Sequence, residues 1–88
     1  MMFHVVFSDQ ARKDLRKMDR QVSVFILNWI RKNLEGCENP RMHGKALTGD
    51  KAGVWRYRVG DYRLICEIHD EEITILVLTA GHRKQFYR

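Results

Sequence analysis

The stretch VWRYRVGDYRL, residues 54–64, decides the fold of this chain. From Trp55 onward, bulky apolar and basic residues alternate with the period of two that is typical of a strand, and Gly60-Asp61 interrupts the alternation. Glycine at the first of two central positions is what a type II′ turn requires. The stretch therefore predicts a tight β-hairpin with a two-residue turn.

The two-residue turn fixes which residues of the predicted hairpin face each other. The expected pairs are Val59 with Tyr62, Arg58 with Arg63, Tyr57 with Leu64, and Arg56 with Ile65. One face is then apolar and suited to carry helices, with Trp55, Tyr57, Val59, Tyr62, Leu64, Cys66 and Ile68. The opposite face, here called the arginine face, carries Arg56, Arg58 and Arg63 beside Ile65, Leu76 and Leu78.

The arginine face is predicted to bind a partner. Like charges placed directly across two strands destabilise a sheet by roughly 0.2–1 kcal/mol, so stability alone does not explain the pair Arg58 and Arg63. Guanidinium groups bind phosphate in a bidentate manner and keep their charge at any working pH. Because this face is also half apolar, we expect it to receive a polyanion. The alternative is a solvated face on which Glu67 screens the arginines.

Upstream of the hairpin, the pattern predicts a strand followed by two helices. Residues 2–7 are apolar and β-branched and end at Ser8, which can cap a helix running to about Met18. Asp19 can cap a second helix that ends before Gly36, a candidate for the left-handed position after the helix. The apolar stripes of the two helices are Ala11, Leu15 and Met18, then Val22, Phe25, Ile26, Trp29, Ile30 and Leu34.

The remaining segments complete a single α+β domain over residues 1–88. Residues 36–53 hold four glycines and Pro40 and predict an irregular crossing segment. Three strands, 54–59, 62–69 and 72–79, then form an antiparallel meander, with Asp70-Glu71 as the second turn. We expect an N-terminal strand, an antiparallel helical hairpin and this meander, with both helices packed on one face of one sheet.

Composition favours a polyanionic partner and a cytoplasmic location. Sixteen Lys and Arg against eleven Asp and Glu give a net charge of +5. No apolar run is long enough to span a membrane, and the first residues lack a basic leader and a cleavage site. Cys37 and Cys66 are predicted to be reduced and structural. The four histidines lack metal-ligand spacing, so we expect no metal and no cofactor.

The last eight residues combine cations, two aromatic rings and an imidazole, in the order GHRKQFYR. Basic residues interleaved with aromatic ones suit single-stranded RNA, because rings stack on bases while cations hold the backbone. The alternative is a frayed terminus whose Phe86 and Tyr87 pack onto the core.

Three motifs together resemble the RelE group of the RelE/ParE toxin superfamily: HGKAL at 43–47, VWRYRVGDYRL at 54–64, and GHR with a near-terminal tyrosine at 81–87. The resemblance implies a RelE-like fold and a toxin of a toxin–antitoxin pair. Such a toxin would enter the ribosomal A site and cleave the mRNA codon there without metal, the ribose 2′-OH attacking the adjacent phosphate. It also implies a cognate antitoxin and a toxin–antitoxin hetero-oligomer.

The resemblance further implies roles for individual residues. Arg63 and Arg83 would stabilise charge on the phosphate, with Arg56 and Arg58 as further cations of the catalytic set. Tyr87 and His82 compete for the roles of general base and acid, and surrounding arginines should lower the pKa of Tyr87. No carboxylate takes the place of the glutamate base found in some relatives. The predicted RNA-binding residues are Lys45, Arg56, Arg58, Arg63 and Lys84.

Two other functions remain open at the level of sequence. One is a ParE-like toxin of the same fold that inhibits DNA gyrase and has no nuclease activity. The other is a non-enzymatic RNA-binding module, which would need the basic face but neither Tyr87 nor His82.

Overall fold

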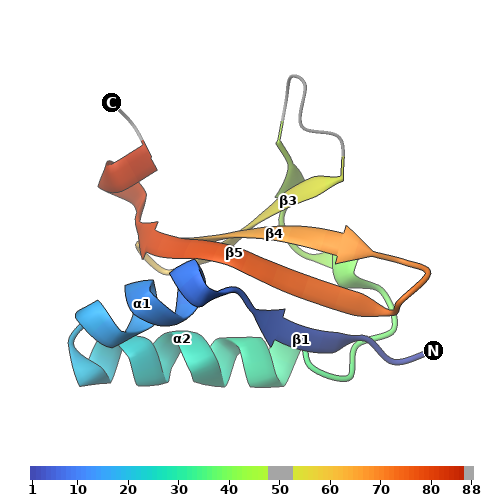
Figure 1. Ribbon diagram of the computed structural model, residues 1–88, viewed down its shortest axis with the longest axis horizontal. Helices are drawn as coiled ribbons and strands as arrows, with labels where there is room; N and C mark the ends of the chain where they lie inside the picture. The colour runs from blue at the N-terminus through green and yellow to red at the C-terminus, as the bar shows by residue number, and fades with distance from the viewer. Residues whose placement is uncertain (48–52, 87–88) are drawn as a thin grey trace.

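A computed structural model describes residues 1–47 and 53–86 of the chain. The elements in this part are β1 (His4–Phe7), α1 (Asp9–Lys17), α2 (Arg20–Asn33), η1 (Pro40–Met42), β2 (Lys45–Ala46), β3 (Val54–Val59), β4 (Tyr62–His69), β5 (Thr74–His82) and η2 (Arg83–Phe86). The strands form one mixed sheet in the order β1-β5-β4-β3-β2. Both α-helices lie on one face of it (Figure 1), which confirms the predicted α+β architecture.

The helix boundaries follow the predicted signals with one exception. Ser8 caps α1, its hydroxyl oxygen accepting a hydrogen bond from the Ala11 N–H at 3.0 Å. Gly36 adopts φ +80° just beyond α2, as predicted. Asp19 stands at the N-cap of α2, as predicted, but its side chain makes no capping hydrogen bond. The α2 helix is held by its packing on the sheet instead.

The core lies between the two helices and the apolar face of the meander. Ile26, Ile30 and Leu34 supply its α2 side, and Ala11 and Leu15 its α1 side. The sheet contributes Tyr57, Val59, Leu64, Cys66, Ile68, Ile75, Val77 and Ala80. Phe25, which the stripe predicts to be in this core, is instead 51% exposed. Its ring lies next to the hairpin turn, where a Cβ at Gly60 would be 3.3 Å from it.

The hairpin has the predicted register. Val59 pairs with Tyr62 and Arg58 with Arg63 across β3 and β4. Gly60 adopts φ +61°, the sign that a type II′ turn requires at its first central position. The arginine face is therefore the side of the sheet opposite to the helices.

The second turn and the last strand differ from the prediction. Residues 70–73 form a four-residue connection in which Ile73 takes φ +51°, and its N–H bonds to the Asp70 carbonyl oxygen at 3.2 Å. Thus β5 begins at Thr74 and continues to His82, two residues later and three residues farther than expected. An irregularity between Ile65 and Cys66 shifts the β4–β5 register, which breaks the alternation on which the prediction relied.

The crossing segment also contributes to the sheet. Lys45 and Ala46 of β2 pair with Arg56 and Trp55 of β3. Two residues carry no strand pattern of their own, and the free edge of β3 supplies the partner groups. At the other edge of the sheet, β1 pairs in parallel with β5.

No helix in the described part of the chain is long and apolar enough to cross a membrane. Both cysteines are free, and Cys66 is buried, as predicted.

Candidate nucleic-acid interface

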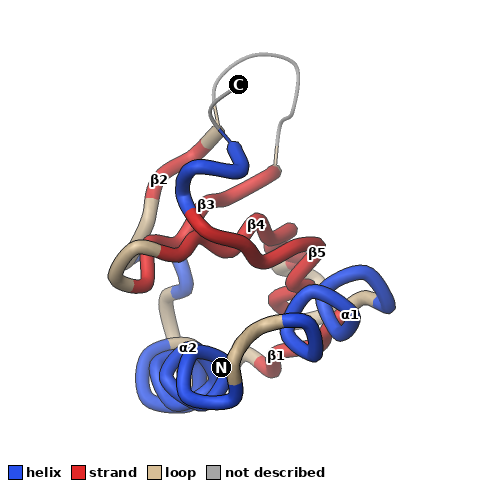
Figure 2. The backbone as a smooth tube through the Cα atoms, turned by 90° about the vertical axis from the view of Figure 1, so that its left-hand side faces the viewer, coloured by secondary structure: helices blue, strands red, loops and turns tan. Residues whose placement is uncertain are grey.

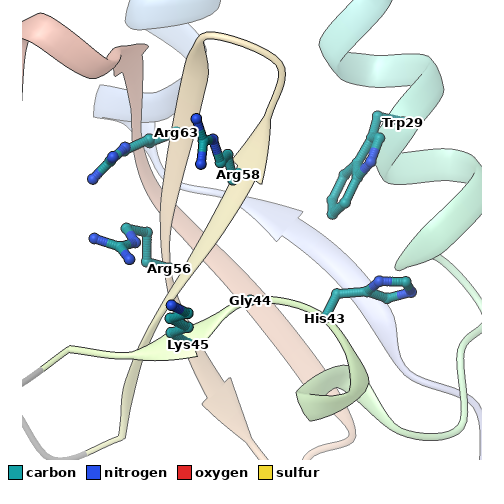
Figure 3. A pocket seen from close by; sticks show the side chains of 7 residues that line it. All are labelled: Trp29, His43, Gly44, Lys45, Arg56, Arg58 and Arg63. Atoms are coloured by element: carbon teal, nitrogen blue, oxygen red, sulfur yellow. The ribbon is translucent and has the colours of Figure 1, made fainter.

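A groove of about 400 Å³ opens where the β3–β4 hairpin meets β2 and the middle of α2 (Figure 3). Its described lining consists of Trp29, His43, Gly44, Lys45, Arg56, Arg58 and Arg63. Four of these residues are cations, and none of them carries a carboxylate. We call this site the cationic groove.

The strand register brings the four cations together. Arg58 is the direct cross-strand partner of Arg63, and Arg56 lies two residues before Arg58 on the same face. Lys45 is in turn the cross-strand partner of Arg56. Figure 3 shows these four side chains on the same side of the hairpin. The alternation that predicted the arginine face thus places all three arginines in the groove, and β2 adds Lys45.

Arg63 lies deepest in the groove. It is 8% exposed and is the one buried charged residue among those the structure describes. Its cross-strand neighbour on the β5 side is Gly81, which has no side chain to compete for space above the strand. A guanidinium at low exposure interacts with an incoming anion more strongly than one in open water, because the local dielectric is lower. Arg63 is therefore the most shielded of the four cations that line the groove.

Two hydrogen bonds to backbone oxygens hold the segment that carries Lys45. The buried Tyr57 hydroxyl donates to the Pro40 carbonyl at 2.6 Å, and Trp55 Nε1 donates to the His43 carbonyl at 2.6 Å. Burial also raises the pKa of Tyr57, so its hydroxyl stays a donor over the whole physiological range. Both anchors come from the apolar face of β3, which fixes the groove wall to the core.

Gly44 allows this segment to approach β3 closely. It adopts φ +79°, and a Cβ at this position would overlap the Arg56 carbonyl oxygen and lie 2.7 Å from Trp55 Nε1. Only glycine fits both the backbone conformation and the contact. The close approach places Lys45 beside Arg56.

Three of the described carboxylates, Glu35, Glu67 and Asp70, form ion pairs away from the groove. Within the described residues, ion pairs join His4 with Glu35, Arg41 with Asp70, and His69 with Glu67. None of these pairs includes Lys45, Arg56 or Arg58. Glu67, the alternative screening group for the arginines, has its Oε1 3.0 Å from His69 Nε2. The charges of Lys45, Arg56 and Arg58 therefore add to a positive potential in the groove.

The C-terminal cations lie on the groove side of the sheet but outside the lining. Arg83 and Lys84 are exposed in η2, which leaves the end of β5 on the side away from the helices (Figures 1 and 2). The Arg83 N–H donates to the Asp61 carbonyl oxygen at 2.8 Å, so η2 is tied to the hairpin turn. Tyr87 falls outside the described residues.

His82 lies apart from the arginines. It pairs with Tyr62 across β4 and β5, and their rings meet edge to face with centroids 5.4 Å apart. Tyr62 belongs to the apolar face, and both rings line a smaller pocket of about 170 Å³ with Asp14 and Lys17 of α1. The structure thus places His82 on the helix side of the sheet. The irregular ladder has one extra residue on β5, which reverses the alternation of faces beyond it, and the sequence did not predict this.

Two lining residues were not predicted to belong to the site. The sequence pattern places Trp29 in the core stripe of α2 and His43 in the HGKAL motif. In the structure their rings meet nearly edge to face, with centroids 6.0 Å apart and an angle of 71°. Gly44 was the one sequence signal for His43, because the close approach of this glycine to β3 also brings the preceding His43 to the groove.

Known proteins resemble this chain over nearly its whole length. Over residues 5–87 the chain matches the family described as the ParE toxin of the type II toxin-antitoxin system, parDE. It is 33% identical over 88 residues to the toxin RelG of Mycobacterium tuberculosis, covering 100% of this chain and 99% of that protein. It is 27% identical over 86 residues to the mRNA interferase toxin RelE of Escherichia coli, covering 97% of this chain and 87% of that protein.

Solved structures place the fold in the same group. The toxin–antitoxin complex RelBE2 from Mycobacterium tuberculosis contains a chain with a TM-score of 0.84 and 31% identity, covering 94% of this chain and 100% of that one. The structure of the isolated RelE toxin of Escherichia coli has a TM-score of 0.71 and 22% identity, covering 91% of this chain and 83% of that one. At this identity the likeness shows only that the two proteins share a fold. The chain therefore belongs to the ParE toxin family of type II toxin–antitoxin systems and, within the RelE/ParE superfamily, to the RelE group.

Proposed function

We propose that this toxin is a ribosome-dependent endoribonuclease that acts in the cytoplasm and cleaves mRNA in the ribosomal A site without metal. The observation that carries the proposal is the convergence of Lys45, Arg56, Arg58 and Arg63 on one groove, with Arg63 at 8% exposure. Escherichia coli RelE, which resembles this chain over nearly its whole length, is named an mRNA interferase.

The cations fit the charge that develops during cleavage. When the 2′-oxygen attacks the adjacent phosphate and the 5′-oxygen leaves, negative charge builds on the phosphate oxygens. Positive groups fixed in advance at a shielded site stabilise such a transition state without reorganising. Arg63 has this position, Arg58 faces it, and Arg56 with Lys45 would hold a neighbouring phosphate of the same strand. Arg83 would join from η2, which the Asp61 carbonyl oxygen ties to the hairpin turn.

The two proton transfers need groups other than arginine. A base takes the 2′-OH proton and an acid protonates the leaving 5′-oxygen, each typically worth about 10²–10⁴-fold in rate. The ring of His82 lies against Tyr62 on the helix side of the sheet, away from the arginine face. We therefore propose Tyr87 as the first candidate for general base or acid, with His82 as the second.

We also propose a cognate antitoxin as the physiological partner. The RelBE2 structure that resembles this chain is described as a toxin–antitoxin complex. An acidic or amphipathic segment would neutralise the cationic groove and cover Ile65 and Leu76, which lie half-buried on the arginine face. Co-expression of the adjacent reading frame should restore growth and yield a hetero-oligomer; two proteins that purify separately would contradict this.

The test is cleavage of mRNA on programmed ribosomes, with RNA ends mapped by primer extension. Wild-type toxin should cut within the A-site codon, and Arg63→Ala and Arg83→Ala should lose most of this activity while keeping a native circular dichroism spectrum. Arg12→Ala, which removes an exposed arginine from α1, is the matched control and should cut normally. Intact codons at high toxin concentration refute the proposal.

Replacing Tyr87 and His82 separates the nuclease from a passive RNA-binding module. Tyr87→Phe should slow cleavage by orders of magnitude, whereas His82→Gln should leave most of it. If the double variant still arrests growth at the wild-type level, the protein acts by binding RNA and not by cutting it.

Gyrase inhibition is the second candidate, and the ParE description of the matched family favours it. Trapped gyrase–DNA complexes after induction, together with intact mRNA, would decide for that function. The nuclease proposal predicts the opposite result in both assays, so one induced culture distinguishes them.

A further inference from the structure

The cationic groove has a second, aromatic wall. Trp29 projects from α2 and His43 from the segment before β2, on the opposite side of the groove from the arginines (Figure 3). A phosphate needs cations but not rings. The combination is what a whole nucleotide would use, since a base stacks on aromatic faces while cations hold its backbone.

Core packing covers only part of the surface of the Trp29 side chain. Its indole meets the Tyr57 ring with centroids 5.8 Å apart, as a core residue would, but Trp29 stays half-buried while Ile26 and Ile30 of the same helix are buried. The remaining surface of Trp29 faces the groove and the edge of His43. Tyr57 thus holds the indole in place without covering it.

The position of His43 is fixed by its backbone, which leaves its side chain free to contact a ligand. Trp55 Nε1 binds the His43 carbonyl oxygen, and Gly44 next to it is pressed against β3. The imidazole itself is exposed, and its described contact is the ring of Trp29. A preformed pair of rings loses little freedom when it binds a flat ligand.

The groove has room for one nucleotide. Its volume of about 400 Å³ falls in the usual range for sites that hold small ligands, about 300–1,000 Å³. Lys45 and Arg56 are cross-strand partners and line the groove opposite the two rings, so one nucleotide can place its phosphate on these cations and its base on the rings.

We propose that Trp29 and His43 form a base-binding subsite that selects one nucleotide of the RNA next to the scissile phosphate. This inference rests on the proposed function, because the nucleotide belongs to the codon that the toxin cleaves. The subsite reads a base by stacking, which favours purines for their larger ring surface, and it takes no part in proton transfer.

The first test uses the full-length toxin and three small probes: AMP, UMP and ribose 5-phosphate. Binding is followed by the NMR signal of the Trp29 indole N–H, and the Trp55 indole signal reports whether the His43 segment stays in place. AMP should bind about fivefold or more tightly than ribose 5-phosphate, the lower end of the stacking contribution of one base. Equal affinities for AMP and ribose 5-phosphate overturn the inference.

Three variants identify the source of any base dependence. His43→Ala should weaken AMP binding severalfold without changing ribose 5-phosphate binding, and His43→Phe should restore it because a ring remains. His4→Ala removes an exposed histidine from β1 at the far edge of the sheet and should have no effect. If His43→Ala weakens both probes equally, or His43→Phe behaves like His43→Ala, the side chain acts as a charge or hydrogen-bonding group and the subsite is refuted.

Programmed ribosomes then separate this inference from the nuclease proposal. The expected result is that His43→Ala still cuts, with a flattened preference at one codon position. If the wild type cuts but His43→Ala shows the same codon profile, the subsite fails and the nuclease stands. If the wild type binds AMP through Trp29 but cuts no ribosome-bound mRNA, the nuclease proposal fails while the base-binding subsite stands.

Discussion

Arg58 and Arg63 are direct cross-strand partners in the β3–β4 hairpin, one pair away from its turn. Like charges at such a position destabilise the pairing, and Arg63 is shielded from water, which weakens screening. The same two side chains supply part of the positive potential of the cationic groove. The stability of the hairpin and the affinity of the groove for anions therefore change in opposite directions when either charge is altered.

Arg58→Glu should stabilise the protein and inactivate it. A carboxylate opposite Arg63 replaces repulsion by attraction, which should raise the free energy of unfolding by roughly 0.2–1 kcal/mol. The same change places a negative charge where the phosphate binds, so growth arrest should be lost. Urea unfolding and plating after induction measure the two effects.

Arg58→Gln is the matched control for this prediction. It removes the repulsion without adding attraction, so its stability should fall between those of the wild type and Arg58→Glu. A loss of stability in Arg58→Glu relative to the wild type would show that the two guanidiniums do not repel each other in the folded protein.

Gly44→Ala should damage the groove through the backbone. The added Cβ meets the Arg56 carbonyl oxygen and Trp55 Nε1, so the segment must move away from β3 and take Lys45 with it. We expect a stability loss larger than the roughly 1–3 kcal/mol of a left-handed residue alone, together with reduced cleavage. Urea unfolding and the ribosome assay test both effects.

Gly36→Ala isolates the conformational part of that loss. Gly36 has nearly the same positive φ, +80° against +79°, but a Cβ there meets no atom within 4 Å. Its variant should lose stability only through backbone strain and should cleave normally. Equal losses in the two variants would mean that the contact between Gly44 and β3 contributes nothing.

The hairpin was predictable because its signals are local. A two-residue turn with Gly60 fixes the register, and the register fixes which face carries Arg56, Arg58 and Arg63. Ser8 and Gly36 were equally readable, since a cap and a left-handed glycine act within a few residues of the chain.

Features that depend on packing between distant segments were not predictable. The start of β5 was misplaced because Ile73, a β-branched residue, adopts the positive φ usually left to Gly or Asn. The two residues of β2 form a strand only because β3 offers a free edge. Trp29 follows the core stripe of α2 in sequence, and it lines a groove whose other wall comes from the distant segment at Gly44 and from β3.

Alkaline pH should destabilise the protein through its buried acids. Burial raises the pKa of Cys66 from 9.0 to about 12 and also raises the pKa of Tyr57. The unfolded chain loses these protons at lower pH than the folded one, so the stabilisation is complete below pH 9 and is lost as the pH rises towards 12. Each such group contributes a slope of about 1.4 kcal/mol per pH unit within its interval.

Cys66→Ala tests the contribution of the thiol. In urea unfolding with a reductant present, the stability difference between wild type and variant should narrow as the pH rises from 9. Ile68→Val, a core change without a titrating group, should run parallel to the wild type across the same range. Parallel curves for Cys66→Ala would show that the folded protein ionises this thiol as readily as the unfolded chain does.

Arg56→Ala should reduce the salt dependence of RNA binding. Each phosphate contact to a single strand adds about 0.7 to the magnitude of the slope of log K against log salt, because a bound cation releases counterions. Arg56 lies in the groove beside Lys45 and has no carboxylate partner among the described residues, so its charge is available to a phosphate.

Fluorescence titrations with a short single-stranded RNA, between about 50 and 200 mM salt, measure this slope. The expected reduction for Arg56→Ala is about 0.7 for one lost contact, with weaker binding at every salt concentration. Arg12→Ala carries the same loss of net charge on the exposed face of α1 and should keep the wild-type slope. If both variants lower the slope equally, RNA senses only the overall charge of +5, and the groove has no special role in holding the backbone.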